Sequence, residues 1–177
     1  GAQSFVMSLT PHAPVENLTA AFVFDCANTE PAPTLPGVNT LSLSASTTPV
    51  ADVIALAATP SGNGILDLDG TNGADAFSIA TINVGKSDVI TAAADTGDTS
   101  LPLDLFVCAT DATSTCLGPP ALGATLDIPN GATATLSVFV NGSGEVPFDP
   151  AVNRVFVRFR DGAGNLRGAT SVAVHTD

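Results

Sequence analysis

Turn-forming residues divide this chain into short apolar segments about 8 to 12 residues apart, a spacing typical of short antiparallel strands. Its 177 residues include 16 glycines and 13 prolines, together with many Asn, Asp, Ser and Thr. The pattern predicts an all-β sandwich or barrel. The expected strands are 4–10, 18–26, 40–46, 53–58, 65–68, 77–84, 89–94, 103–109, 124–128, 133–140, 154–160 and 170–175.

Residues 50–58 also fit a short helix, because Thr48 suits a helix cap and Pro49 suits the first helical turn. We favour the strand, since Pro60 and Gly62 follow closely and so short a helix adds little stability by itself.

Two hairpin patterns bracket the C-terminal part of the chain. Apolar alternation on both sides of a Val-Gly turn opens the region near residue 75, and the two strands around residues 161–164 close it. We therefore expect a seven-strand immunoglobulin-like antiparallel β-sandwich over 75–177, with a boundary at Gly70–Gly73. Residues 1–74 are expected to form an N-terminal β unit, either an independent sandwich packed on the first or an extension of its sheets.

The charge of the chain is strongly acidic and unevenly distributed. The formal net charge is −12, and residues 1–85 contain seven acids and neither Lys nor Arg. Nucleic acid is disfavoured as a partner, because its phosphates are bound by clustered basic residues. Membrane insertion is not expected either, since no apolar run reaches the roughly 20 residues that span a bilayer.

Three cysteines occur, and the most plausible pair is Cys108 with Cys116. A predicted strand ends at Cys108, and the polar residues that follow can turn the chain back. A disulfide across this short loop indicates an oxidising, extracellular compartment. The alternative is three reduced thiols in a cytosolic protein. In the favoured pairing Cys26 is left unpaired, as a small buried hydrophobe or a link to a neighbour.

All four arginines lie in one predicted hairpin. Alternation along residues 154–160 places Val155, Val157 and Phe159 on the inward face and Arg154, Arg158 and Arg160 on the other. We favour a solvated face neutralised by nearby aspartates. The alternative is that Arg154, Arg158 and Arg160 are assembly contacts for the acidic surface of a neighbouring copy or repeat.

The residue inventory argues against an enzyme. The chain has two histidines, one lysine and neither Trp nor Tyr, and His12 and His175 lie near opposite ends. We expect no catalytic residue and no cofactor. Asp67, Asp69 and Asp75 form a weak calcium candidate, although a plain acidic turn is favoured because the ligand spacing of an EF-hand is missing.

Several segments resemble a known class of repeat. They include INVGKSDVITAAADTG, LFVCATDATSTCLGPP and VPFDPAVNRVFVRFRDGAGNLRGATSVAVHT, together with residues 26–64. They are similar to tandem immunoglobulin-like β-sandwich modules of large secreted or surface proteins of Gram-negative bacteria. The resemblance implies a non-enzymatic structural or adhesive module at the bacterial surface, a repeat or subunit that contacts itself or neighbouring repeats. The alternative is a binding module for calcium, a glycan or a host protein.

Overall fold

The computed structural model describes residue 4 and residues 6–25, 27–35 and 39–177. Within these residues the chain is all β, with eleven strands and no helix. No segment therefore qualifies as a helix able to cross a membrane in the described part of the chain. The strands are β1 (Val15–Ala21), β2 (Thr40–Ala45), β3 (Val53–Ala58), β4 (Ile65–Leu68), β5 (Ala74–Asn83), β6 (Asp88–Asp95), β7 (Leu103–Thr110), β8 (Gly123–Ile128), β9 (Thr133–Gly142), β10 (Arg154–Arg160) and β11 (Leu166–Thr176).

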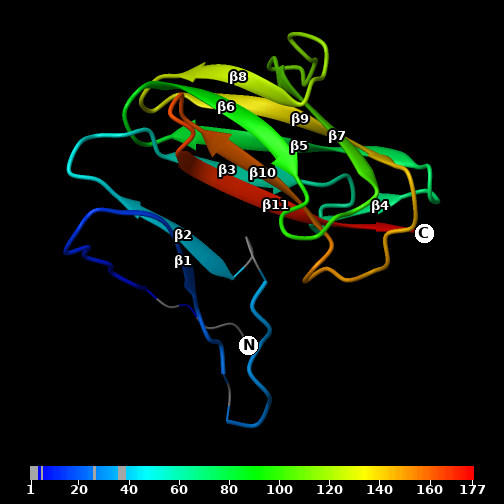
Figure 1. Cartoon of the computed structure of the whole chain (residues 1–177), viewed down its shortest axis with the longest axis horizontal. Coiled ribbons are helices and arrows are strands. Elements are labelled where there is room, and N and C mark those ends of the chain that lie inside the picture. The colour runs from blue at the N-terminus through cyan, green and yellow to red at the C-terminus, as the bar shows by residue number, and fades with distance from the viewer. Residues whose placement is uncertain (1–3, 5, 26, 36–38) are drawn as a thin grey trace.

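Two sheets pack face to face and enclose one core (Figure 1). One has the strand order β4-β11-β10-β6-β8, and the other has the order β3-β5-β9-β7. All neighbouring strands are antiparallel except β4 and β11, which run parallel. The expected all-β fold of antiparallel sheets is confirmed.

The core follows from the alternation of side chains along each strand. On β10, Val155, Val157 and Phe159 are fully buried, as predicted. On β9 of the opposite sheet, Leu136 and Val138 point into the same core. Burial of these branched and aromatic side chains is the main stabilising contribution to the sandwich.

Strand β3 replaces the helical alternative considered for residues 50–58. Val53 is buried, Ala55 and Ala57 pack against the core, and Ile54 and Leu56 point outward. This two-residue period suits a strand at the side of a sheet, with one face on the core and the other in water.

The sandwich includes strands on both sides of the boundary expected at Gly70–Gly73. Strand β3 pairs with β5, and β4 pairs with β11, so both extend the sheets formed by β5–β11. Residues 53–68 therefore contribute strands to the same two sheets as residues 74–176.

Strands β1 and β2 form a separate two-stranded sheet, which we call the ribbon. It lies below the sandwich in Figure 1, and a long connection joins its two strands. The prediction of a strand over 4–10 is wrong for residue 4 and residues 6–10, which have no strand pairing. A strand forms only where a second strand satisfies its backbone groups, and apolar composition does not supply one.

Candidate functional site

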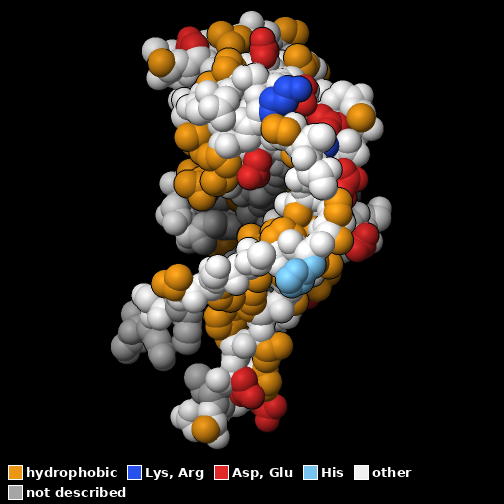
Figure 2. Space-filling model, turned by 90° about the vertical axis from the view of Figure 1, so that its left-hand side faces the viewer, with side chains coloured by type: hydrophobic (Ala, Val, Ile, Leu, Met, Phe, Trp, Pro, Cys, Tyr) orange, Lys and Arg blue, Asp and Glu red, His pale blue; other side chains and the backbone are white. Residues whose placement is uncertain are grey.

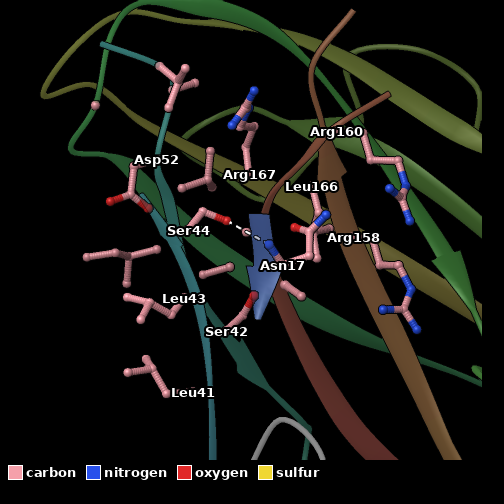
Figure 3. A pocket seen from close by; sticks show the side chains of 18 of the residues that line it. Asn17, Leu41, Ser42, Leu43, Ser44, Asp52, Arg158, Arg160, Leu166 and Arg167 are labelled. Atoms are coloured by element: carbon pink, nitrogen blue, oxygen red, sulfur yellow. Dashed lines mark hydrogen bonds between the residues drawn. The ribbon is translucent and has the colours of Figure 1, made fainter. Parts of the chain in front are cut away.

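A groove of about 940 Å³ separates the ribbon from the sandwich (Figures 2 and 3). Strand β2 lines one side, and the outer face of β10 and β11 lines the other. Leu41 and Leu43 project from β2, whereas Arg158 and Arg160 project from β10. The start of β3, from Val53 to Ala55, also borders the groove. The groove is therefore bordered by the ribbon, by the start of β3 and by the face of β10 that carries Arg158 and Arg160, which we call the basic wall.

The ribbon is amphipathic. Its register places Leu18 opposite Leu43, and Thr19 opposite Ser42. One face is therefore apolar and the other is polar. Leu18 is 49% exposed and Leu41 is 39% exposed, so the apolar face is only partly covered.

Arg158 and Arg160 differ in what they contact. Nε and Nη2 of Arg158 donate to the two carboxylate oxygens of Asp95, at 2.6 and 3.2 Å, and its guanidinium lies 5.0 Å from the centre of the Phe156 ring. Nη1 of Arg160 donates to the carbonyl oxygen of Gly164 at 2.9 Å. Among the described residues no carboxylate forms an ion pair with Arg160. Arg160 is thus the arginine of the basic wall whose charge is left for a partner.

Arg154 does not lie on a solvated face. It is buried, with 4% of its surface exposed, and its guanidinium donates to Pro150 O at 2.7 Å and to Ser171 Oγ at 3.1 Å. Burial lowers the pKa of Arg154 from its ordinary value. The side chain is on the predicted outer face of β10, but the segment before the strand covers it. Arg154 therefore fastens that segment to the sheet and is not accessible as an assembly contact.

Arg167 and Asp161 form a partly buried ion pair at the β10–β11 turn. Arg167 Nη2 lies 2.7 Å from Asp161 Oδ2, and the two side chains are only 7% and 9% exposed. Asp161 also accepts hydrogen bonds from the backbone N–H groups of Ala163 and Asn165. Burial acts to raise the pKa of Asp161, but the bonds from Arg167, Asn165 and Ala163 outweigh it and hold the pKa below its ordinary value.

The ion pair between Arg167 and Asp161 should make the free energy of unfolding depend on pH in the acid range. Because the pKa of Asp161 is lower in the folded chain than in the unfolded chain, its contribution to stability is complete above the unfolded value of about 4 and is lost as the pH falls through the folded value. We expect Asp161→Asn to lose less unfolding free energy than wild type between pH 6 and pH 2, measured by urea unfolding. Asp98→Asn, at an exposed turn, should keep the wild-type loss. Equal losses for wild type and Asp161→Asn would contradict this assignment.

The three acids of the calcium candidate lie on three different elements of the fold. Asp67 lies on β4 and faces His175 Nε2 at 2.6 Å, whereas Asp75 lies on β5 in the other sheet and accepts a hydrogen bond from the N–H of Ala76. Asp69 lies in the turn between these strands. No group of three or more His, Cys, Asp and Glu side chains among the described residues is arranged to hold a metal ion.

The predicted disulfide between Cys108 and Cys116 is present, with 5.6 Å between its Cα atoms. It holds the segment after β7 against the edge of that strand. Val107 and Ala121 exchange two backbone hydrogen bonds, and the N–H of Leu117 donates to Ala109 O. The segment therefore covers the outer edge of β7. Cys26 lies outside the described residues.

Loss of this disulfide should affect both stability and association. The closed loop is short, so the chain-entropy estimate is about 2.5 kcal/mol of lost unfolding free energy for Cys108→Ser with Cys116→Ser. An uncovered β7 should also increase association, because a free strand edge pairs readily. Urea unfolding and light scattering test both effects, with Cys26→Ser as the control that keeps the disulfide. If the double variant and the control have the same urea midpoint and the same light scattering, both expected effects are wrong.

A scan against protein-family models and a search of curated proteins both found no match for the chain. The site is therefore defined by its geometry alone. The sequence predicted the basic hairpin and two strands, 18–26 and 40–46, that overlap β1 and β2 of the ribbon, but it predicted neither their pairing nor the groove. The sequence feature that could have indicated the ribbon is that residues 6–24 are largely apolar and contain neither Lys nor Arg. This feature indicates an interacting segment but not its partner.

Proposed function

We propose that this chain is a non-enzymatic extracellular structural or adhesive module, a repeat or subunit of a bacterial surface or fibre assembly. The observation that carries the proposal is the ribbon and its flanking segments, which expose apolar side chains that the sandwich does not cover. A two-stranded sheet is marginally stable in water and needs further packing. A neighbouring module in an assembly supplies that packing.

The exposed apolar residues are concentrated before the sandwich begins. Among the described residues, seven of the fifteen large hydrophobic residues that are exposed lie between residues 6 and 41: Val6, Met7, Leu9, Leu18, Val23, Phe24 and Leu41. A concentration of exposed apolar side chains in one part of a chain is typical of an interaction site.

The strand order supports the immunoglobulin-like assignment. If β3, β5, β6, β7, β9, β10 and β11 are taken as strands A to G, the two sheets contain A-B-E-D and G-F-C, with β4 and β8 added at edges. The resemblance to tandem surface modules leads to the same fold. The disulfide is consistent with an oxidising environment outside the cell.

Self-association is the property that tests the proposal. We expect sedimentation velocity of the full chain to show species larger than a monomer as concentration rises, and negative-stain electron microscopy to show elongated assemblies. A chain that stays monomeric at millimolar concentration, at both low and high salt, would contradict the proposal.

The groove favours one alternative, a ligand-binding module. Its volume of about 940 Å³ falls within the range of about 300 to 1,000 Å³ typical of small-molecule sites, and Arg160 suits an anionic group such as an acidic glycan. A ligand that binds only the folded chain must raise its melting temperature. Thermal unfolding with uronic-acid oligosaccharides tests the acidic-glycan form of this alternative, and an unchanged melting temperature at millimolar ligand excludes that form.

A further inference from the structure

Three of the four edge strands of the sandwich, as the structure describes it, are protected against pairing with another chain. The edge of β7 is covered by the disulfide-linked segment. Strand β8 carries the exposed Asp127 and is followed by Pro129, and β4 has four residues with Asp67 exposed. Coverage, charge, proline and short length are the usual means by which proteins prevent unwanted strand pairing.

Strand β3 is the exception. Its sequence, VIALAA, contains neither charge nor proline, and the strand is six residues long. Ile54 is 51% exposed and Leu56 is 71% exposed. Its pairing with β5 is regular and shows no bulge. The start of β3 packs against β11, where the carbonyl group of Val53 approaches Gly168, so the apolar edge available for pairing begins after Val53.

The backbone of β3 has groups available for pairing on its outer side. The carbonyl oxygen of Asp52 accepts a hydrogen bond from the N–H of Val84. Because backbone groups alternate along a strand, Ile54 and Leu56 also bond toward β5, whereas Ala55 and Ala57 turn their N–H and C=O groups outward. The groove lies beside the first half of this edge, where Ile54 and Ala55 line it together with residues 168–170 of β11.

Residues 6–10 of the same chain form a segment that could pair with such an edge. Their sequence, VMSLT, favours a strand, yet they have no strand pairing in the structure. Val6, Met7 and Leu9 are 99%, 57% and 50% exposed. The chain thus contains a strand-forming segment without a partner strand and a sheet edge without one.

We infer that residues 6–10 of one copy add as a strand to the edge of β3 in a second copy. This inference rests on the proposed function and specifies the contact that joins modules. A register that places Met7 and Leu9 beside Ile54 and Leu56 covers all four side chains and satisfies the outward backbone groups of Ala55 and Ala57.

Charge favours a second copy as the occupant. Two chains of net charge −12 repel each other, so they associate most easily through surfaces that carry no charge. Residues 1–15 contain no Lys, Arg, Asp or Glu, and neither does β3. The first acid after the donor segment is Glu16, and Arg160 on the wall of the groove offers it an unpaired cation.

The test uses donor and acceptor variants of the full chain, each with Cys26→Ser so that thiol cross-links cannot contribute. The donor variant carries Met7→Lys and Leu9→Lys, and the acceptor variant carries Ile54→Lys and Leu56→Lys. All four positions are exposed, so the variants should keep the wild-type circular dichroism spectrum and melting temperature. The control is Leu122→Lys, at a leucine that is 77% exposed and distant in sequence from both segments.

Sedimentation velocity should show association of each double variant weakened by about 30-fold or more, the loss expected for central interface side chains. The control should associate like the parent chain. A mixture of donor and acceptor variants should form a dimer and nothing larger, because only the intact segment of one variant can meet the intact edge of the other.

Two results would overturn the inference, and they are distinguishable. If the parent chain assembles and both double variants assemble equally well, strand addition is wrong while the structural proposal stands. If the parent chain is monomeric at all concentrations, both the strand addition and the proposed structural function are wrong.

Discussion

Phe159→Ala is expected to lower the free energy of unfolding by about 4 kcal/mol, the largest effect of any single substitution considered. Phe159 lies in the middle of the core and is fully buried. Truncation removes the transfer energy of the ring and leaves a cavity that a close-packed sandwich fills only partly. Urea unfolding monitored by circular dichroism measures the change.

Phe148→Ala is the matched control, because it removes the same side chain from the surface. Phe148 is 62% exposed and contacts the His175 ring edge-on, with 5.1 Å between the ring centres. We expect a loss below about 1 kcal/mol. Similar losses for the two variants would mean that Phe159 does not occupy the core described above.

Arg167→Met should lower the free energy of unfolding by about 3 kcal/mol at neutral pH. The substitution keeps most of the side-chain volume but leaves the partly buried carboxylate of Asp161 without its cation, and a shielded charge without a counter-ion is costly. Arg160→Met, in the same hairpin, removes an exposed guanidinium and should cost less than about 1 kcal/mol.

A double-mutant cycle separates the ion pair from general packing. Combining Arg167→Met with Asp161→Asn should cost less than the sum of the two single changes, because the double variant buries no unpaired charge. Strict additivity would show that the pair contributes no coupling and that Arg167 acts only through its aliphatic stem.

Local pattern predicted the strands of the sandwich because their alternation is strong. The bounds predicted for 53–58, 65–68 and 154–160 agree with β3, β4 and β10, and the inward set on β10 is correct. The disulfide was also predicted, since a strand and a polar turn bring the two cysteines together.

Features that depend on distant contacts were not predictable. Alternation places Arg154 on the outer face of β10, but it does not reveal that the carbonyl oxygen of Pro150 and the side chain of Ser171 enclose the guanidinium. Asp67 and Asp75 are close in sequence, yet their strands join different sheets. The segment 6–10 has the composition of a strand but lacks a partner in this chain, which composition cannot show.

Backbone hydrogen exchange at Ala55 and Ala57, measured against protein concentration, tests most directly whether the β3 edge receives a strand from a second copy. In dilute protein these N–H groups face outward and should exchange rapidly, whereas amides of the central strand β9 should exchange slowly at every concentration. We predict that exchange at Ala55 and Ala57, and within residues 6–10, slows together as the concentration rises. Rates at these positions that stay constant while the protein assembles would contradict the account.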